Sequence, residues 1–273
     1  MKKFSHHEGH EAHEQTKNTI KGFLIDLDGV VYIEDQTIPG AVEAVNWLRR
    51  QGFPIRFLTN TTMRSRGSLV AKLLRFGVHA DTAEMFSTAV VAARWLADKG
   101  VARVQLLLAE DARKDFAGFE ITDRQPEVVV VGDMGSAFTF DVLNSAFLSV
   151  KAGARLIALQ KSRFWRTKNG LAVDAGAFVA ALEYATETEA ALIGKPNRAY
   201  FETALADMGL DAAQAAMVGD DIHTDIIGAQ ALGIPTILVR TGMYSFDAQK
   251  QLSVQPDWTI DSIADLPGLL DVR

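Results

Sequence analysis

The 273-residue chain has no cysteine, no long apolar run and no excess of basic residues. The lack of cysteine excludes disulfides, thiolate metal sites and a cysteine nucleophile, and it fits a cytoplasmic protein. No apolar run approaches the roughly 20 residues that a bilayer-spanning helix needs, and the N-terminus lacks the apolar core of a signal peptide. A net charge of −6 offers no basic field for nucleic acid. We therefore expect a protein that binds neither membranes nor nucleic acids.

Histidine is scarce as well, and four of the six histidines lie in one polar N-terminal segment: His6, His7, His10 and His13. Pairs of them could share a helical face and bind a transition metal. We prefer the plainer interpretation of a solvated tail, so we assign no function to residues 1–19.

What the sequence does contain is an alternation of short apolar runs and helical patterns. Residues 39–52 and 64–78, for example, show helical spacing and end at or close to a glycine. The candidate strands are residues 23–25, 55–58, 104–108, 128–131, 156–159, 190–193, 215–218 and 236–239. This order predicts right-handed βαβ units and an α/β fold with a parallel sheet.

Polar residues follow four of these candidate strands directly. In chain order they are Asp26 and Asp28, Thr59 and Asn60, Lys195, and finally Asp220, Asp221 and Asp225. Parallel sheets place their ligand sites at the carboxyl ends of the strands. If the four strands share one sheet, these residues converge on a single site.

The chemistry of such a site follows from its residue types. Converging carboxylates repel one another unless a cation neutralises them, and oxygen ligands suit Mg²⁺. A lysine with hydroxyl and amide donors suits phosphoryl oxygens. One aspartate could attack phosphorus, while an acid two residues later moves the proton. The residues therefore predict Mg²⁺-dependent phosphoryl chemistry.

Four short stretches, "DLDGV", "LTNTT", "GKP" and "VGDDIHTDI", occur in this order along the chain. Together they resemble the motifs of the haloacid-dehalogenase-like (HAD) hydrolase superfamily. Their spacing resembles the type IIA branch, which includes NagD-type and 4-nitrophenylphosphatase-like enzymes. Stretches such as "DAGAFVAALEYA" and "LVRTGMY" resemble phospholysine phosphohistidine inorganic pyrophosphate phosphatase-like proteins most.

The resemblance implies a Rossmann-like three-layer parallel-sheet core, formed by residues 20–81 and 189–273. An α/β cap domain of the C2 type is implied for residues 82–188. The resemblance implies that Asp26 is the nucleophile and a metal ligand, and that Asp28 is the general acid/base and binds the metal through its backbone carbonyl. It implies phosphate binding for Thr59, Asn60 and Lys195. Asp220 is implied as a further metal ligand, with Asp221 and Asp225 in a second layer around the metal. Thr61 departs from the pattern, because many relatives have a second asparagine there.

The resemblance implies a phosphatase that uses an aspartyl-phosphate and acts on a small phosphorylated substrate. Pyrophosphate, phospholysine or phosphohistidine, sugar phosphates and nucleotides all stay open. Other classes are a dehalogenase, against which Asp28 and Asp220 argue, a phosphomutase, and a non-catalytic regulatory or scaffold protein. The plain alternatives are an ordinary surface position for Lys195, a solvated helix position for Asp225, and a capping or turn role for the other site residues.

The cap carries the main uncertainty about specificity. Residues 160–178 include Arg163, Phe164, Trp165, Arg166 and Lys168, which could face an anionic or planar leaving group. An exposed turn, or a contact in a homodimer formed through the cap, explains them equally well. The stretch "VGDMG" imitates the fourth motif, but we interpret its aspartate as cap structure.

Overall fold

The computed structural model describes residues 19–167, 170–244 and 255–270, so the His-rich tail and Lys168 lie outside the described residues. The chain divides into two compact units by the density of its internal contacts. Unit 1 comprises Met1–Thr59, Leu73–Glu84 and Phe201–Arg273, and unit 2 comprises Asn60–Lys72 and Met85–Tyr200. The predicted domain borders near residues 82 and 188 stay a prediction.

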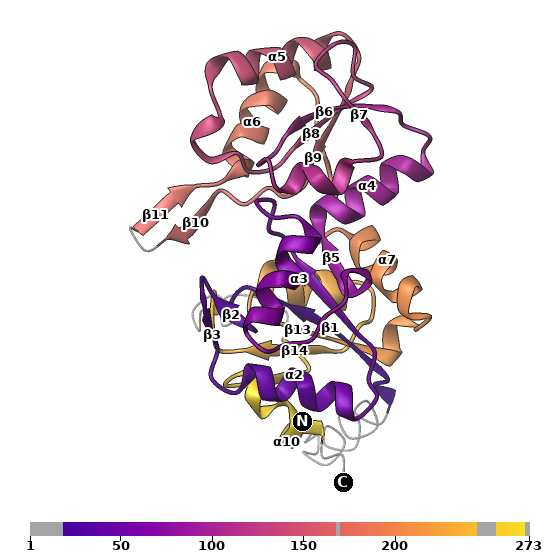
Figure 1. Ribbon diagram of the computed structural model, residues 1–273, viewed down its shortest axis with the longest axis vertical. Coiled ribbons are helices and arrows are strands. Elements are labelled where there is room, and N and C mark those ends of the chain that lie inside the picture. Colours follow the sequence, from indigo (N-terminus) through magenta and orange to yellow (C-terminus); the bar gives the residue numbers. More distant parts are fainter. Residues whose placement is uncertain (1–18, 168–169, 245–254, 271–273) are drawn as a thin grey trace, which may run out of the picture. The chain divides into compact units, whose positions relative to one another are not determined.

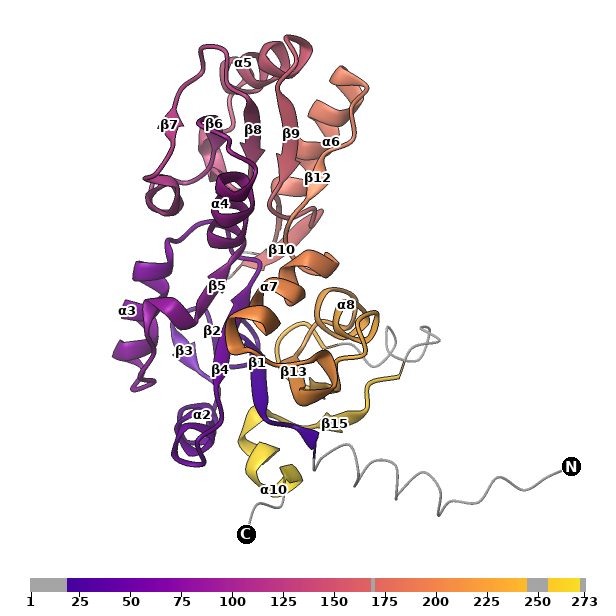
Figure 2. The ribbon, with the colours of Figure 1, turned by 90° about the vertical axis from the view of Figure 1, so that its right-hand side faces the viewer.

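Unit 1 is an α/β unit with helices on both faces of a parallel sheet. Its strands and helices are β1 (Gly22–Asp26), β2 (Tyr32–Ile33), β3 (Gln36–Thr37), α2 (Ala41–Arg50), β4 (Ile55–Thr59), β13 (Ala215–Gly219), α8 (Ile227–Gln230), β14 (Thr236–Val239), β15 (Trp258–Ile260) and α10 (Leu266–Leu270). Strands β15, β14, β13, β1 and β4 are neighbours in this order, and each pair is parallel. Helices α2 and α8 cover opposite faces of this sheet (Figures 1 and 2). The predicted three-layer parallel core is confirmed.

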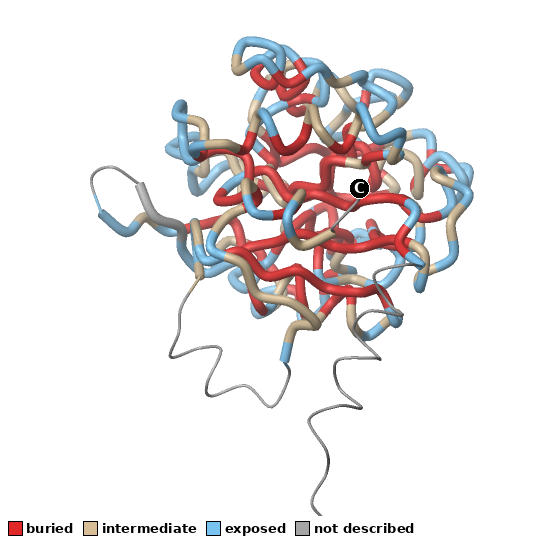
Figure 3. The backbone as a smooth tube through the Cα atoms, turned by 90° about the horizontal axis from the view of Figure 1, so that it is seen from below, coloured by how far each residue is buried: buried red, intermediate tan, exposed pale blue. Residues whose placement is uncertain are grey.

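Strand β1 is central in this sheet because both of its faces are apolar. Phe23, Leu24 and Ile25 are fully buried, and the strand pairs with β13 on one side and β4 on the other. A strand buried on both faces reads as a continuous apolar run and not as an alternating one. Figure 3 shows such strands as unbroken buried segments. Asp26 thus stands at the carboxyl end of a rigid strand.

Unit 2 has a parallel sheet of its own, in the order β12-β9-β8-β6-β7. Its elements are β5 (Met85–Ser87), α4 (Thr88–Asp98), β6 (Arg103–Leu107), β7 (Glu120–Ile121), β8 (Val128–Val131), α5 (Phe140–Lys151), β9 (Arg155–Ala158), β10 (Phe164–Thr167), β11 (Gly170–Val173), α6 (Ala175–Thr186) and β12 (Ala191–Leu192). Two further helices, α3 (Arg66–Arg75) and α7 (Arg198–Met208), contribute residues to both units.

The core of unit 2 lies between its sheet and the helices α5 and α6. Val129 and Val131 of β8 belong to the same buried cluster as Val150 of α5 and Val179 of α6. Phe138 and Phe178 stack beside this cluster, with ring centroids 3.8 Å apart. These contacts make unit 2 an α/β layer with its own hydrophobic core.

One strand prediction is wrong in its placement. Convergence on a single site requires residues 190–193 to share a sheet with the other three site strands. The structure instead pairs β12 with β9 of unit 2, through Ala191 with Ile157 and Leu192 with Ala158. Strand β12 has only two residues, so its local sequence carries no pattern that indicates a sheet. Lys195 therefore follows a strand of unit 2.

In the described ranges, no helix combines the length and apolar character needed to cross a bilayer.

Candidate active site

Three carboxylates of unit 1 converge at the carboxyl ends of adjacent strands. Asp26 ends β1, Asp220 follows β13, and Asp225 lies in the π-helical turn that follows, Ile222–Ile226. One oxygen from each side chain lies within 4.8 Å of the other two, and all three residues are buried. We call Asp26, Asp220 and Asp225 the carboxylate trio.

The carboxylate trio suits a hard divalent cation. Buried carboxylates this close repel one another unless a positive charge lies between them. The trio offers only oxygen atoms, a donor set that fits Mg²⁺, while zinc prefers nitrogen and sulfur ligands. These residues therefore fit the metal that the sequence predicted.

The trio differs from the predicted ligand set in one member. Asp28 lies beyond the end of β1, is exposed, and forms a bridge with Tyr32. Its predicted metal contact uses the backbone carbonyl, which does not require its carboxylate to join the trio. Asp225, predicted to lie in a second layer, is 1% exposed and joins Asp26 and Asp220 directly.

Asp221 and Asp225 are separated by the local helix geometry. The Asp221 carboxylate caps the π-helical turn by accepting hydrogen bonds from the backbone N–H of His223 at 2.8 Å and of Thr224 at 3.4 Å. The Asp225 carboxylate accepts the Asp221 N–H at 3.3 Å. Gly219 allows this approach, because a β-carbon at that position would overlap the Asp225 side chain. Asp221 is thus used locally, while Asp225 is turned into the site.

Asp220 is held by two glycines that sequence reasoning did not single out as site residues. Gly29 and Gly242 both have positive φ, of 85° and 60°, and a β-carbon on either would overlap the Asp220 carboxylate. The Met243 N–H donates to Asp220 Oδ2 at 2.5 Å, and the Thr241 hydroxyl donates to the carbonyl of Gly29. Residues 241–243 follow β14, so the strand-end rule that found the acids could also have found them.

Gly242→Ala is expected to lower stability and weaken Mg²⁺ binding. Left-handed backbone costs a non-glycine residue about 1–2 kcal/mol. Overlap with the Asp220 carboxylate adds about 1–3 kcal/mol of strain and displaces that carboxylate from the trio. Urea unfolding measures the stability change, and isothermal titration with Mg²⁺ measures the affinity.

Gly233→Ala is the matched control for this substitution. Gly233 also lies in unit 1 with a positive φ of 76°, but a β-carbon added there would have no other atom within 4 Å. The Gly233→Ala protein should lose only the free energy of unfolding that left-handed backbone costs, about 1–2 kcal/mol, and should keep its Mg²⁺ affinity. Equal losses of stability and of Mg²⁺ affinity in the two variants would contradict the role of Gly242 in positioning the Asp220 carboxylate.

Thr59 is the predicted phosphate-binding residue that lies in unit 1. It ends β4, is buried, and follows the residue Leu58 that pairs with Asp26. Adjacent parallel strands therefore bring Thr59 to the same sheet edge as Asp26.

Asn60 and Lys195 form a second group, within unit 2. The Asn60 side chain accepts the Lys195 N–H at 2.9 Å and donates to the Lys195 carbonyl, also at 2.9 Å. The lysine is buried, with 3% of its surface exposed. The structure thus pairs two residues that lie 135 positions apart in the sequence.

The segment after β4 is attached to two further strand ends of unit 2. The Thr62 hydroxyl accepts the Asp133 N–H, at 2.8 Å, just beyond β8. The Ser65 N–H donates to Asp111, beyond β6, at 2.9 Å. Burial raises the pKa of Asp111, but hydrogen bonds from Lys114 and Ser65 outweigh it and lower the pKa to about 2. Asp133 serves here as a turn residue, in line with its interpretation as cap structure.

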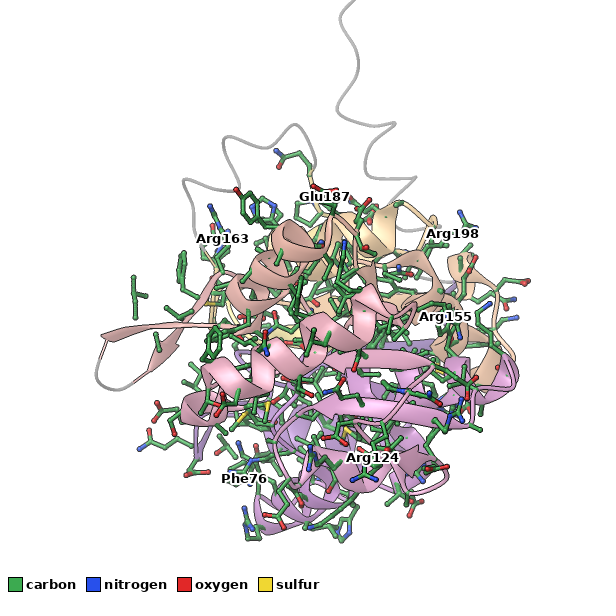
Figure 4. The ribbon with its side chains drawn as sticks, turned by 90° about the horizontal axis from the view of Figure 1, so that it is seen from above. Phe76, Arg124, Arg155, Arg163, Glu187 and Arg198 are labelled. Carbon is green, nitrogen blue, oxygen red and sulfur yellow. The ribbon has the colours of Figure 1, made fainter. Side chains whose placement is uncertain are left out.

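The predicted specificity segment forms the hairpin β10–β11, whose base is fixed by Gln160 and Asp174. Gln160 donates to Asp174 at 2.5 Å, and Asp174 caps α6 through the Ala175 N–H at 2.7 Å. Burial raises the pKa of Asp174. Arg163, directly before β10, is exposed (Figure 4), and Phe164 is 47% exposed. The side chains of Trp165 and Arg166 lie outside the described residues.

Comparisons with known proteins agree with this architecture. The "Haloacid dehalogenase-like hydrolase" family model matches residues 23–122, and a second HAD-hydrolase-like model matches residues 192–266. Haloacid dehalogenase-like hydrolase domain-containing protein 2 from Homo sapiens is 40% identical over 243 residues, covering 89% of this chain and 93% of that protein. Phospholysine phosphohistidine inorganic pyrophosphate phosphatase from Homo sapiens is 35% identical over 257 residues, covering 92% and 94%.

Solved structures give the same result. The p-nitrophenyl phosphatase from Archaeoglobus fulgidus has a TM-score of 0.85 at 31% identity, covering 90% of this chain and 98% of that one. NagD from E. coli K-12 has a TM-score of 0.83 at 28% identity, with the same coverage of 90% and 98%. The chain therefore belongs to the haloacid dehalogenase-like hydrolase family, in its type IIA branch.

Proposed function

We propose that this protein is a Mg²⁺-dependent phosphatase that hydrolyses a small phosphorylated substrate through an aspartyl-phosphate. The carboxylate trio at the ends of β1 and β13 carries the proposal. Several similar proteins are phosphatases by name, including the p-nitrophenyl phosphatase and the phospholysine phosphohistidine inorganic pyrophosphate phosphatase. We propose pyrophosphate or a phosphoramidate such as phospholysine or phosphohistidine as the substrate, with cytoplasmic action.

In the proposed reaction, an Asp26 carboxylate oxygen attacks phosphorus and the bond from phosphorus to the leaving group breaks. Asp28 gives its proton to the leaving atom. Asp28 then takes a proton from a water, whose oxygen attacks phosphorus and releases Asp26 and inorganic phosphate. Lys195 and Thr59 bind phosphoryl oxygens. Asn60 directly follows Thr59 in the chain and pairs with the Lys195 backbone.

Asp26, Asp220 and Asp225, together with the Asp28 carbonyl, are proposed to hold the Mg²⁺. When bound, the ion would neutralise the carboxylates and polarise the phosphoryl group. The exposure of Asp28 leaves its carboxyl accessible to the attacking water, whose proton replaces the one given to the leaving atom.

Phosphate release over a panel of substrates tests the function. The panel contains pyrophosphate, phospholysine, phosphohistidine, sugar phosphates and nucleotides, with Mg²⁺ present. We expect selective release from a pyrophosphate or phosphoramidate bond, loss of the activity in EDTA and its return when Mg²⁺ is restored.

Each other outcome of the panel has a definite meaning. Preference for a sugar phosphate or nucleotide would support the alternative of a NagD-type phosphatase. Full activity in metal-free buffer would contradict the metal role. Absence of phosphate release from every substrate would favour the non-catalytic alternative.

A homodimer formed through unit 2 also stays a proposal. Several large apolar side chains of its helices and hairpin are exposed, namely Phe140, Leu148, Leu171, Val173 and Tyr184. Tyr184 is 89% exposed, which is unusual for a large aromatic side chain.

A further inference from the structure

The Asn60 side chain extends the hydrogen-bond ladder of a strand in unit 2. After β12, the N–H of Ile193 donates to Ala158 and the N–H of Gly194 donates to Leu159, at 3.0 and 3.1 Å. The next N–H, that of Lys195, has passed the end of this ladder and donates to Asn60 Oδ1 instead. Asn60 therefore takes the place of a strand residue opposite Lys195.

The Asn60 amide satisfies both backbone groups of Lys195 at once. Its oxygen accepts the Lys195 N–H and its nitrogen donates to the Lys195 carbonyl, each at 2.9 Å. Only this orientation of the amide fits both bonds, because a backbone N–H must face an acceptor and a carbonyl must face a donor. Oδ1 is thus committed to the protein, and so is one of the two hydrogens on Nδ2.

The surroundings fix this arrangement tightly. A β-carbon at Gly194 would lie only 2.8 Å from Asn60 Oδ1 and 2.6 Å from Thr88 Cγ2, so the backbone before Lys195 is packed directly against the amide. Thr62 and Ser65, on the same segment, are bonded to the ends of β8 and β6. These two bonds therefore fix the backbone segment that carries Asn60.

We propose that Asn60 is the positioning residue for Lys195 and acts on the phosphoryl group through that lysine, not as an independent phosphate ligand. The proposal rests on the proposed function, because it assumes that Lys195 binds a phosphoryl oxygen. A backbone held at both its N–H and its carbonyl fixes the direction of the Cα–Cβ bond from which the lysine side chain extends. Misplacement of a binding group by about 1 Å can cost on the order of 10²-fold in rate.

A double-mutant cycle in kcat/KM tests the proposal, using Asn60→Ala, Lys195→Met and the double variant. Asn60→Ala alone is expected to lower kcat/KM by about 10- to 100-fold. In the Lys195→Met background, the same substitution is expected to have almost no effect, because the group that it positions is gone. Equal effects in both backgrounds would show an independent phosphate contact and overturn the proposal, as would unchanged activity of Asn60→Ala.

Thr62→Val is the matched control, since it removes a neighbouring bond of the same segment to a different strand end. Its effect, whatever its size, should be the same with and without the Lys195 side chain. If Asn60→Ala does not fold, as judged by circular dichroism, Asn60→Ser replaces it in the cycle.

Amide hydrogen exchange gives a readout that does not depend on activity. The exchange of the Lys195 N–H, followed by NMR, should be slow in the wild-type protein and faster in Asn60→Ala, but unchanged in Thr62→Val. Unchanged exchange in Asn60→Ala would overturn the proposal. If Lys195→Met keeps full activity, the proposed phosphate role of Lys195 fails instead, and the exchange result still reports whether Asn60 holds its backbone.

Discussion

Asp26→Asn is expected to give a folded protein whose phosphate release falls by on the order of 10⁴-fold or more. The amide is the same size as the carboxylate but is a far weaker nucleophile. In addition, removing one of three buried negative charges relieves repulsion when no cation is present. Urea unfolding without Mg²⁺ should therefore show equal or higher stability for the variant. This combination separates loss of chemistry from loss of fold.

The intermediate offers a second measurement on the same variant. Acid quenching during turnover of a phosphorus-labelled substrate should trap label on the wild-type peptide that contains Asp26, and none in Asp26→Asn. Asp98→Asn, at an exposed position at the end of α4, is the control for the same chemical change. A folded Asp26→Asn protein with near wild-type turnover would contradict the assignment of Asp26 as the nucleophile.

Asp225→Asn and Asp221→Asn are expected to differ sharply, although both acids follow β13. Asp225 belongs to the carboxylate trio, so its substitution should raise the Mg²⁺ concentration needed for half-maximal activity by about 10- to 100-fold. Asp221 is occupied in capping the π-helical turn. Asparagine caps helices about as well as aspartate, so Asp221→Asn should change this concentration by only a few-fold.

Calorimetric titration with Mg²⁺ checks the same contrast without substrate. The expected order of affinity is wild type, then Asp221→Asn, then Asp225→Asn. A reversed order would mean that Asp221 is the ligand and that the buried position of Asp225 is purely structural.

The central strands were predictable from sequence because burial on both faces leaves a plain signal. Residues 23–25 and 215–218 are apolar without alternation, and both lie in the middle of the sheet of unit 1. The polar residues directly behind them then follow from the geometry of parallel sheets. Asp26 and Asp220 were found in this way, and the structure brings them together.

The remaining features depend on contacts between distant segments. The sheet to which the two-residue strand β12 belongs is shown by its pairing with β9 of unit 2, which lies more than 30 residues earlier in the chain. Asp225 enters the trio because the turn after Asp221 is π-helical, and its spacing differs from that of an α-helix. Gly242 lies just beyond β14, where the strand-end rule points, but its close fit against Asp220 depends on a contact between distant segments that the local sequence does not show.

The borders of the two compact units matter for anyone who builds chimaeras from this chain. A swap of residues 82–188 alone would carry away Asp111 and Asp133 but leave behind their partners Ser65 and Thr62, and it would leave the pair Asn60 and Lys195 behind as well. A transplant that takes Asn60–Lys72 together with Met85–Tyr200 keeps every one of these bonds intact. The borders at Lys72 and Tyr200 fall inside α3 and α7, so a chimaera has to take these two helices whole together with the segment that follows β4.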